Sequence, residues 1–253
     1  MRIDLNCDMG EGLGGREVDE EMMSLVSSAN VACGFHASEP GNMHRTVRLA
    51  KAHGVAVGAH PSYPDRPGFG RRDLAASPDQ VRDDVLYQVG ALLAFCRAEG
   101  VPLCHVKAHG ALYNAAAKDL PTALAVAEAV RSVDPNLWLV CLFGSAQVEA
   151  ARCTGLRYVE EVFADRAYSR DGRLVPRTTP GSVIDDAAAV GERVLRMVKE
   201  GKVHSLDGTD IAVGGGTICV HGDTPGSVEL ARAIRDRLLG EGVELAPFSR
   251  EET

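Results

Sequence analysis

The sequence has no apolar run that approaches the roughly 20 residues needed to cross a bilayer, and its N-terminus lacks the basic and apolar pattern of a secretory signal. It also has no stretch with the composition of a linker. A chain of 253 residues can bury one sizeable core. We therefore expect a cytoplasmic protein with a single domain over residues 1–253.

The sequence also lacks a stripe of lysine or arginine. Its formal net charge is −8, and the basic residues are scattered. Nucleic acids and anionic membranes attract clustered positive charge, so neither is expected as a partner.

The seven cysteines form no CxxC pair and mostly lie inside apolar segments. This pattern favours free buried thiols over disulfides or a zinc site. Cys7 and Cys33 lie close to polar strand ends, so a catalytic thiol at either position is an open alternative.

The phosphate-binding pattern GxxxxGK[ST] is missing as well, and the three glycines at 214–216 precede a strand instead of joining a strand to a helix. If the reaction uses ATP, the usual cradle for it is not in this chain. Asp223 and Thr224 could hold an anion or cap the following helix, and capping is the favoured interpretation.

Helical and extended patterns alternate along the chain. Apolar residues at helical spacing, with caps and terminal glycines, predict four helices: 43–54, 77–100, 184–201 and one from Thr224 and Pro225 to Gly240. Short apolar runs predict strands at 55–59, 101–106, 137–142, 156–159 and 218–220. Alternating units of this kind predict a parallel sheet with helices outside it.

Five short β-favouring segments of the chain end in polar or ionisable residues beside glycine. They lie within residues 2–12, 29–38, 55–65, 105–114 and 217–223. An open sheet collects its ligand mainly at one switch point, whereas a barrel gathers residues from many strand ends. A barrel is therefore favoured. The stretch 165–180 interrupts the alternation of extended and helical segments. Its Asp-Gly pair predicts a hairpin or lid over the site.

The first strand carries Asp4, Asn6 and Asp8 on one side, because side chains alternate along a strand. Burying three polar groups against helices would be costly, so we expect them at the barrel interior or rim. The alternative is that Asp4 or Asp8 only binds backbone amides of the next loop.

His36 and His60 each follow a strand beside small residues. With Asp8 they could bind zinc, manganese or iron. Residues from separate strands have no diagnostic spacing, so hydrogen-bonding or acid/base histidines without a metal are the favoured interpretation.

Lys107 lies at a strand end between His105 and His109. A lysine there must either form a salt bridge with a carboxylate or face an anionic ligand, and the second is favoured.

Several long motifs resemble the lactam-utilisation (LamB/YcsF) family, in the same order from Asp4 to Asp223. They are DLNCDMGE, NVACGFHA, GAHPSYPD, FGRR, HVKAHGALYN, EVFADRAY with RLVPR after it, and VHGD. The resemblance implies a distorted seven-stranded (β/α) barrel, similar to glycoside hydrolases and polysaccharide deacetylases and hence TIM-barrel-like. It also implies opening of 5-oxo-L-proline to L-glutamate with ATP as co-substrate, together with partner subunits B and C. It does not decide between a monomer and a homo-oligomer.

For that reaction we expect phosphorylation of the lactam oxygen, addition of water, and collapse of the adduct. Lys107 and Arg166 or Arg177 would hold anionic oxygens, and His60, His109 or Asp8 would orient or deprotonate water. The remaining expected substrate-binding residues are Asn6, His36, His105, Asn114 and His221.

Two other functions stay open. One is a metal-dependent carbohydrate deacetylase or amidohydrolase that needs no ATP. The other is a non-catalytic subunit that binds 5-oxoproline or a partner while the chemistry occurs on another chain.

Overall fold

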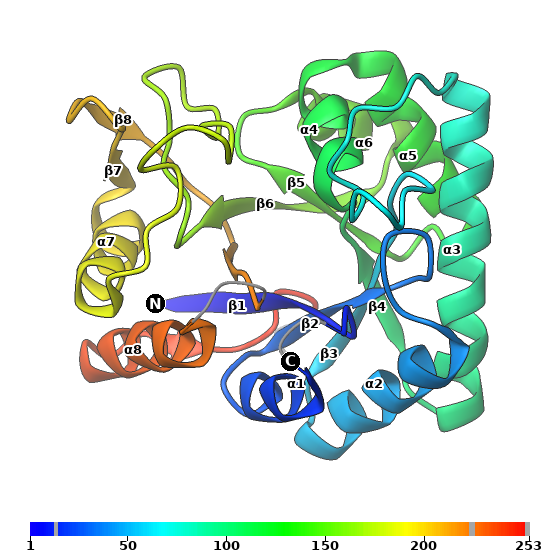
Figure 1. The fold of residues 1–253 in the computed structure, drawn as a ribbon, viewed down its shortest axis with the longest axis horizontal. Helices are drawn as coiled ribbons and strands as arrows, with labels where there is room; N and C mark the ends of the chain where they lie inside the picture. The colour runs from blue at the N-terminus through cyan, green and yellow to red at the C-terminus, as the bar shows by residue number, and fades with distance from the viewer. Residues whose placement is uncertain (13–14, 223–225, 251–253) are drawn as a thin grey trace.

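Seven parallel strands close into a barrel in the computed structural model, which describes residues 1–12, 15–222 and 226–250 (Figure 1). Their order around the barrel is β1-β2-β3-β4-β5-β6-β9, and pairing of β1 with β9 closes it. The predicted barrel is therefore confirmed. The strands are β1 (Arg2–Met9), β2 (Ser28–Ala32), β3 (Ala56–His60), β4 (Leu103–Val106), β5 (Trp138–Leu142), β6 (Arg157–Phe163) and β9 (Thr217–Val220).

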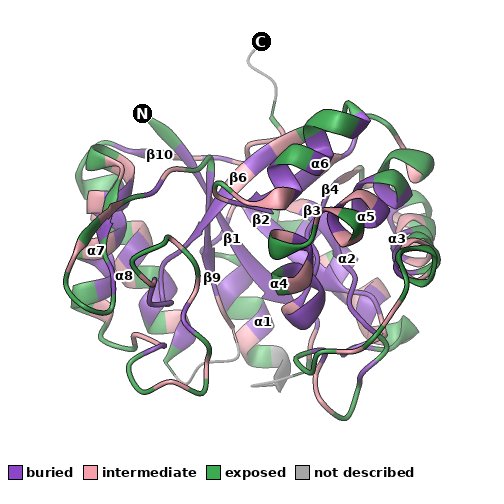
Figure 2. Ribbon diagram, turned by 90° about the horizontal axis from the view of Figure 1, so that it is seen from above, coloured by how far each residue is buried: buried purple, intermediate pink, exposed green. Residues whose placement is uncertain are grey.

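Helices surround the barrel, with their exposed faces outward and the buried strands at the centre (Figure 2). They are α1 (Gly15–Met23), α2 (Pro40–His53), α3 (Pro78–Glu99), α4 (Gly110–Lys118), α5 (Leu120–Val133), α6 (Ala146–Thr154), α7 (Ala187–Glu200) and α8 (Ser227–Gly240). No helix among the described residues is long and apolar enough to cross a membrane.

The capping signals were accurate guides to several helix ends. Ser77 and Gln80 form the predicted capping box at the start of α3, and Gly100 ends that helix in the left-handed conformation. The prediction for α7 was wrong at its start: Ile184 precedes the helix, which begins at Ala187 after the Asp186 cap. The expected caps Asp223, Thr224 and Pro225 lie outside the described residues, and Gly226 precedes α8.

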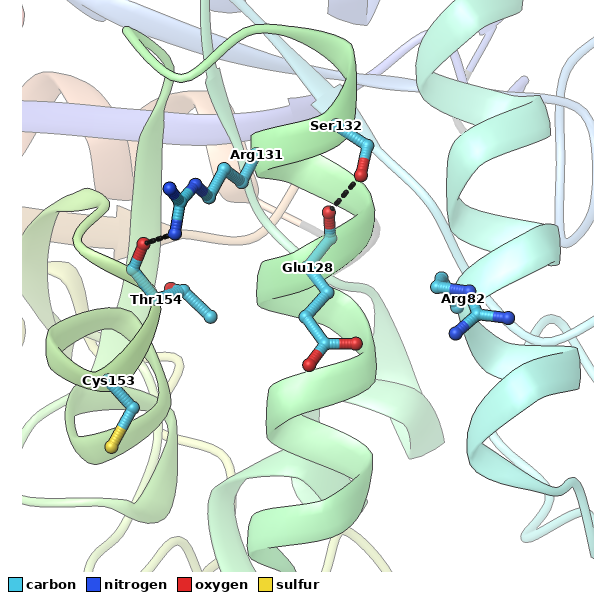
Figure 3. Close-up of a pocket in the computed structure, with 6 residues that line it drawn as sticks. All are labelled: Arg82, Glu128, Arg131, Ser132, Cys153 and Thr154. Atoms are coloured by element: carbon cyan, nitrogen blue, oxygen red, sulfur yellow. Dashed lines mark hydrogen bonds between the residues drawn. The ribbon is translucent and has the colours of Figure 1, made fainter.

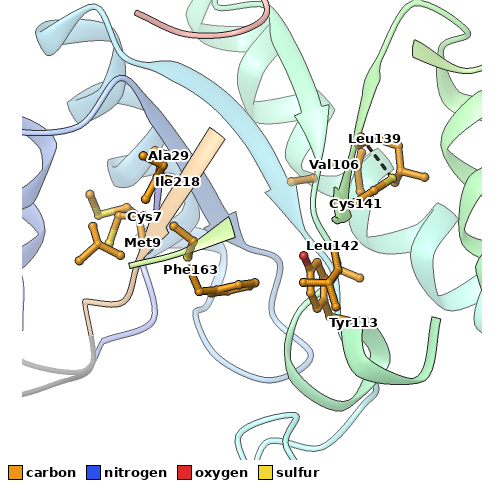
Figure 4. Close-up of a cluster of buried hydrophobic side chains, with 14 of the residues drawn as sticks. Cys7, Met9, Ala29, Val106, Tyr113, Leu139, Cys141, Leu142, Phe163 and Ile218 are labelled. Atoms are coloured by element: carbon orange, nitrogen blue, oxygen red, sulfur yellow. Dashed lines mark hydrogen bonds between the residues drawn. The ribbon is translucent and has the colours of Figure 1, made fainter. Parts of the chain in front are cut away.

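Side-chain alternation divides the strand residues into two sets. The odd-numbered residues of β1, among them Cys7 and Met9, face the helices together with residues such as Ala29 and Ile218, and they form the apolar layer between barrel and helices (Figure 4). The even-numbered residues of β1 face the barrel interior. The main hydrophobic core is thus outside the barrel wall, which leaves the interior for polar groups.

The end of the barrel at which the strands begin is closed by the C-terminal segment. Strand β10 (Glu244–Leu245) pairs in parallel with the start of β1. Phe248 then contacts the edges of His105 and Trp138, with ring centroids 5.3 and 5.7 Å apart. We call this end the barrel floor, and the opposite end, where the strands finish, the barrel top.

Between β6 and α7 the chain makes an irregular excursion. Tyr168 and Leu174 pair antiparallel across the Asp171–Gly172 turn, and Arg166 pairs with Val183. A small antiparallel sheet of β7 (Lys202–His204) and β8 (Asp210–Ala212) lies beside α7, and no sequence pattern had predicted it.

Candidate functional site

Asp4 is buried on the barrel floor among hydroxyl groups. Its carboxylate accepts hydrogen bonds from Ser27 Oγ at 2.6 Å, from Ser28 Oγ at 2.7 Å and from Thr217 Oγ1. Burial raises the pKa of Asp4 to about 6, although these hydroxyls favour the ionised form. Asp4 therefore joins three strands through hydroxyl groups, and not through the loop amides considered from the sequence.

Asn6 stands one layer higher and all of its side-chain hydrogen bonds are formed inside the barrel. Its amide donates to Glu161 Oε1 at 2.9 Å and to Thr217 Oγ1 at 2.7 Å. Its carbonyl oxygen accepts from Asn30 Nδ2 at 2.7 Å and from Lys107 Nζ at 3.3 Å. This amide links β1 to four other strands or strand ends and has no unused polar group for a ligand.

Lys107 is 2% exposed and lies at the centre of the cluster. Its ammonium is 3.1 Å from Asp8 Oδ1, 3.0 Å from Glu161 Oε1 and 3.0 Å from Cys219 Sγ. Burial opposes its charge, but these neighbours outweigh burial and hold the pKa of Lys107 well above its usual value. Of the two roles considered, the geometry matches the salt bridge, with carboxylates of the chain itself as partners.

His60 and His109 meet above Lys107. His60 Nδ1 lies 2.7 Å from the Lys107 carbonyl oxygen, and its Nε2 lies 3.2 Å from Asp8 Oδ2 and 3.0 Å from His109 Nδ1. His109 Nε2 lies 2.9 Å from the Phe69 carbonyl oxygen. Each ring thus turns one nitrogen to a backbone carbonyl and the other toward its neighbour.

His36 completes this group from the loop after β2. Its Nδ1 lies 3.0 Å from Ser62 Oγ and its Nε2 lies 3.0 Å from Glu11 Oε1. The ring stacks on His109, with 3.8 Å between centroids. Burial, together with the neighbouring imidazoles, lowers the pKa of both His36 and His109 well below the usual value, so both rings are neutral.

Two groups of side chains at the barrel top have ligand atoms close enough together to hold a metal ion. One consists of Glu11, His36, His60 and His109, and the other of Asp8, Cys219 and His221; within each group the ligand atoms lie within 4.8 Å of one another. The predicted set of Asp8, His36 and His60 is thus divided between two groups.

His221 follows β9 and is held by a carboxylate. Its Nδ1 lies 2.9 Å from both Oδ1 and Oδ2 of Asp165, and its ring stacks on Phe163. Its side chain is 11% exposed, more than those of His60 and His109. Asp165 therefore fixes the tautomer that leaves His221 Nε2 free of the proton at neutral charge.

Two expected substrate-binding residues lie away from the barrel top. His105 points into the barrel near its floor, where its Nε2 donates to Asn30 Oδ1 at 2.7 Å beneath the Lys107 layer. Asn114 is exposed on α4. His105 shares the interior side of the strand with Lys107 but lies nearer the floor, and Asn114 lies on the exposed face of α4, so neither reaches the barrel top.

The arginines of the excursion differ in their surroundings. Arg166 is buried, and its guanidinium donates to the carbonyl oxygens of Val175 at 2.6 Å and Ser182 at 3.3 Å. Burial and the nearby Arg177 lower the pKa of Arg166 to about 10. Arg166 thus stabilises the excursion by joining two parts of that segment. Arg177, in contrast, is half-buried near Asp165.

The thiols considered as nucleophiles are not activated. All seven cysteines are free, and Cys7 and Cys33 are buried. Burial raises the pKa of Cys33 to about 12 and that of Cys7 well above its usual value. Cys7 also faces the helices, so neither residue presents a thiolate to the cluster.

A groove on the outer surface is separate from this cluster (Figure 3). It lies among α3, α5 and α6, where Arg131 Nη1 donates to the Thr154 carbonyl oxygen at 2.6 Å. This bond satisfies a carbonyl at the end of α6, which is a structural role.

Sequence reasoning missed Glu161, Asp165 and Cys219, which all touch predicted site residues. Glu161 was missed because the sixth strand was expected to end at Val159, four residues before its actual end at Phe163. Alternation along TICVH would have placed Cys219 on the same side as His221. Asp165 had a signal in its position directly after a strand, but it was assigned to the excursion.

The chain is similar to known proteins over nearly its full length. The model of the LamB/YcsF family matches residues 3–253. The A subunit of a 5-oxoprolinase from Thermus thermophilus is 56% identical over 250 residues, covering 98% of this chain and 100% of that protein. The corresponding protein from Pyrococcus furiosus is 51% identical and covers 98% of each chain. The crystal structure of a lactam utilization protein from Thermus thermophilus superposes with a TM-score of 0.92 at 55% identity, covering 98% and 100% of the two chains.

Proposed function

This chain belongs to the LamB/YcsF family, and on that premise we propose that it is the A subunit of an ATP-dependent 5-oxoprolinase. The complex, with subunits B and C, opens 5-oxo-L-proline to L-glutamate. The observation that carries the proposal is the end-to-end match to relatives named as the A subunit of 5-oxoprolinase. The cluster of acids, histidines and a lysine at the barrel top supports it, because opening a lactam requires groups that move protons.

The chemistry of the lactam sets the task of the site. An unstrained five-membered lactam is a poor electrophile, and transfer of the ATP γ-phosphoryl group to its oxygen makes the ring carbon reactive. Water then adds to that carbon. Loss of phosphate from the adduct would only regenerate the lactam. The productive path breaks the carbon–nitrogen bond, with a proton delivered to nitrogen, and a second water hydrolyses the resulting γ-glutamyl phosphate.

His221 suits this proton transfer best. Asp165 holds its Nδ1, which leaves Nε2 to take a proton from the attacking water and return it to the ring nitrogen. Asp8 lies in the same group and would orient the water. The same histidine would thus serve as base and then as acid, which favours breaking the carbon–nitrogen bond.

Lys107, His60 and His109 have a supporting role in this proposal. Lys107 keeps Asp8 ionised, because burial alone would raise the pKa of that carboxyl but His60 and Lys107 hold it well below its usual value. Arg177, at the half-buried edge of the excursion, is the arginine we assign to the carboxylate or phosphoryl oxygens. ATP is assigned to the partner subunits or to an interface with them, since the sequence lacks the usual phosphate loop.

The test is release of glutamate from 5-oxoproline by the purified chain alone and with subunits B and C, with and without ATP. We expect release only from the complete complex with ATP, and loss of at least about 100-fold in kcat for the His221→Gln variant. Hydrolysis of amides or acetylated sugars by the chain alone without ATP would favour the deacetylase alternative. Full activity of complexes carrying His221→Gln and Asp8→Asn would leave only a binding role for this chain.

A further inference from the structure

We propose that Glu11, His36, His60 and His109 bind a transition-metal ion, with zinc as the best chemical match. The four residues lie at or just after the ends of four consecutive strands, β1 to β4, and their ligand atoms lie within 4.8 Å of one another. Three imidazole nitrogens and one carboxylate oxygen suit Zn²⁺, or Fe²⁺ and Mn²⁺ as weaker competitors. The set differs from the one expected from the sequence, because Glu11 and His109 replace Asp8.

The first argument concerns the nitrogens that face away from the group. His60 Nδ1 and His109 Nε2 each contact a backbone carbonyl oxygen, which can only accept a hydrogen bond. His36 Nδ1 contacts Ser62 Oγ, and that hydroxyl already donates to the Tyr63 carbonyl oxygen at 2.8 Å. All three rings therefore carry their proton on the outward nitrogen.

The second argument follows from those tautomers. With the outward nitrogen of each ring donating, the inward nitrogens His36 Nε2, His60 Nε2 and His109 Nδ1 are the ones that can offer lone pairs to an ion. His60 Nε2 and His109 Nδ1 are 3.0 Å apart, and His36 Nε2 is 3.0 Å from Glu11 Oε1. Four acceptor atoms thus converge, and acceptors at hydrogen-bond distance repel one another unless a cation lies among them.

The inward nitrogen of His60 also lies 3.2 Å from Asp8 Oδ2, which is a further acceptor beside the group. A single divalent ion satisfies all four acceptors at once, and the outward contacts are those that orient histidine ligands around metals.

The second group, Asp8, Cys219 and His221, is the weaker candidate. Lys107 Nζ contacts both Asp8 and Cys219, so a cation already occupies the place that a metal would take. Burial raises the pKa of the Cys219 thiol well above its usual value, whereas metals bind the thiolate.

The experiment titrates the full chain, freed of metal by a chelator, with Co²⁺ as a visible stand-in for Zn²⁺. We expect an absorption band that saturates at one equivalent per chain and disappears when Zn²⁺ displaces Co²⁺. Glu11→Gln and His109→Gln should each weaken binding by at least about 100-fold. The matched control is His53→Gln, since His53 is exposed on α2, and its affinity should equal that of the wild type.

Three results would overturn the assignment: a wild-type chain that gives no band, a Glu11→Gln variant that binds as tightly as the wild type, or loss of binding in His221→Gln but not in Glu11→Gln. Circular dichroism of each variant shows whether it folds, and Glu11→Gln decides the matter if a histidine variant unfolds. The assay needs no substrate, ATP or partner subunit. Its outcome is therefore independent of the proposed 5-oxoprolinase activity.

Discussion

Lys107 is the residue whose charge the barrel interior most depends on. It neutralises Asp8 and Glu161, and with an apolar side chain in its place these two buried carboxylates would lack a counter-ion. We expect Lys107→Met to lower the free energy of unfolding by about 3–5 kcal/mol, measured by urea denaturation, and to abolish turnover of the reconstituted complex.

A double variant separates the charge from the loss of packing. Adding Glu161→Gln to Lys107→Met removes one uncompensated carboxylate and should recover part of the lost stability. Lys118→Met on the exposed face of α4 is the control, with an expected change within about 0.5 kcal/mol. No recovery in the double variant would contradict the assigned ion pair.

Asp4 predicts how stability depends on pH. Its pKa is raised from an ordinary 3.8 to about 6 by burial, so between these values the folded chain holds a proton that the unfolded chain has lost. The stabilisation from this proton is complete below the lower value and disappears as pH rises through the upper one. Relative to Asp4→Asn, the wild type should lose at most about 3 kcal/mol across this window. Parallel stability curves for the two proteins would show that Asp4 titrates normally.

The positions of some interior residues could be predicted from the sequence, but their partners could not. Alternation along β1 correctly placed Asp4, Asn6 and Asp8 inside the barrel, because a period of two is fixed by local geometry. The partners of Lys107 could not be found in this way. Glu161 is brought to it only when the strands close into a barrel, and nothing near position 107 in the sequence specifies that contact.

At the scale of elements, β3 and β4 fit together because Gly58 has no side chain. A Cβ atom there would overlap the His105 ring, so His105 would have to move and lose its bond to Asn30. We expect Gly58→Ala to lower stability by about 1–3 kcal/mol. Gly90, exposed within α3 with nothing within 4 Å, is the matched control, and Gly90→Ala should instead add about 0.5–1 kcal/mol. Thermal unfolding of both variants tests the pair, and equal shifts would refute the packing argument.

Several elements with strong local signals were predicted, but the 14-residue helix α5 was missed although Asp119 caps it. The capping box and terminal glycine located α3 to within a residue at each end. Helix α1 has few apolar residues, and β7 and β8 have three residues each. Their hydrophobic patterns were therefore too short or too weak to predict these elements. The start of α7 was misplaced because Ile184 continues the apolar pattern, whereas the Asp186 side chain fixes the helix end.

The molecule as a whole has two ends with different tasks. In parallel barrels the strand C-termini carry chemistry and the opposite end carries stability. Here the histidine and carboxylate groups follow the strand ends, while Asp4, His105 and Phe248 lie on the floor. Closure of the barrel joins the first strand to the last of the seven, so the site forms only when nearly the entire chain is folded.

Phe248 tests this separation, because it closes the floor without touching the barrel top. Its ring is half-buried against His105 and Trp138, so Phe248→Ala should lower the free energy of unfolding by about 1–2 kcal/mol. Well below the unfolding temperature, Co²⁺ affinity and kcat of the reconstituted complex should equal those of the wild type, since neither depends on the floor. A fall in kcat or in Co²⁺ affinity while the variant remains folded would mean that the floor and the top are coupled through the polar ladder Asn6–Asn30–His105, and that the interior acts as one unit.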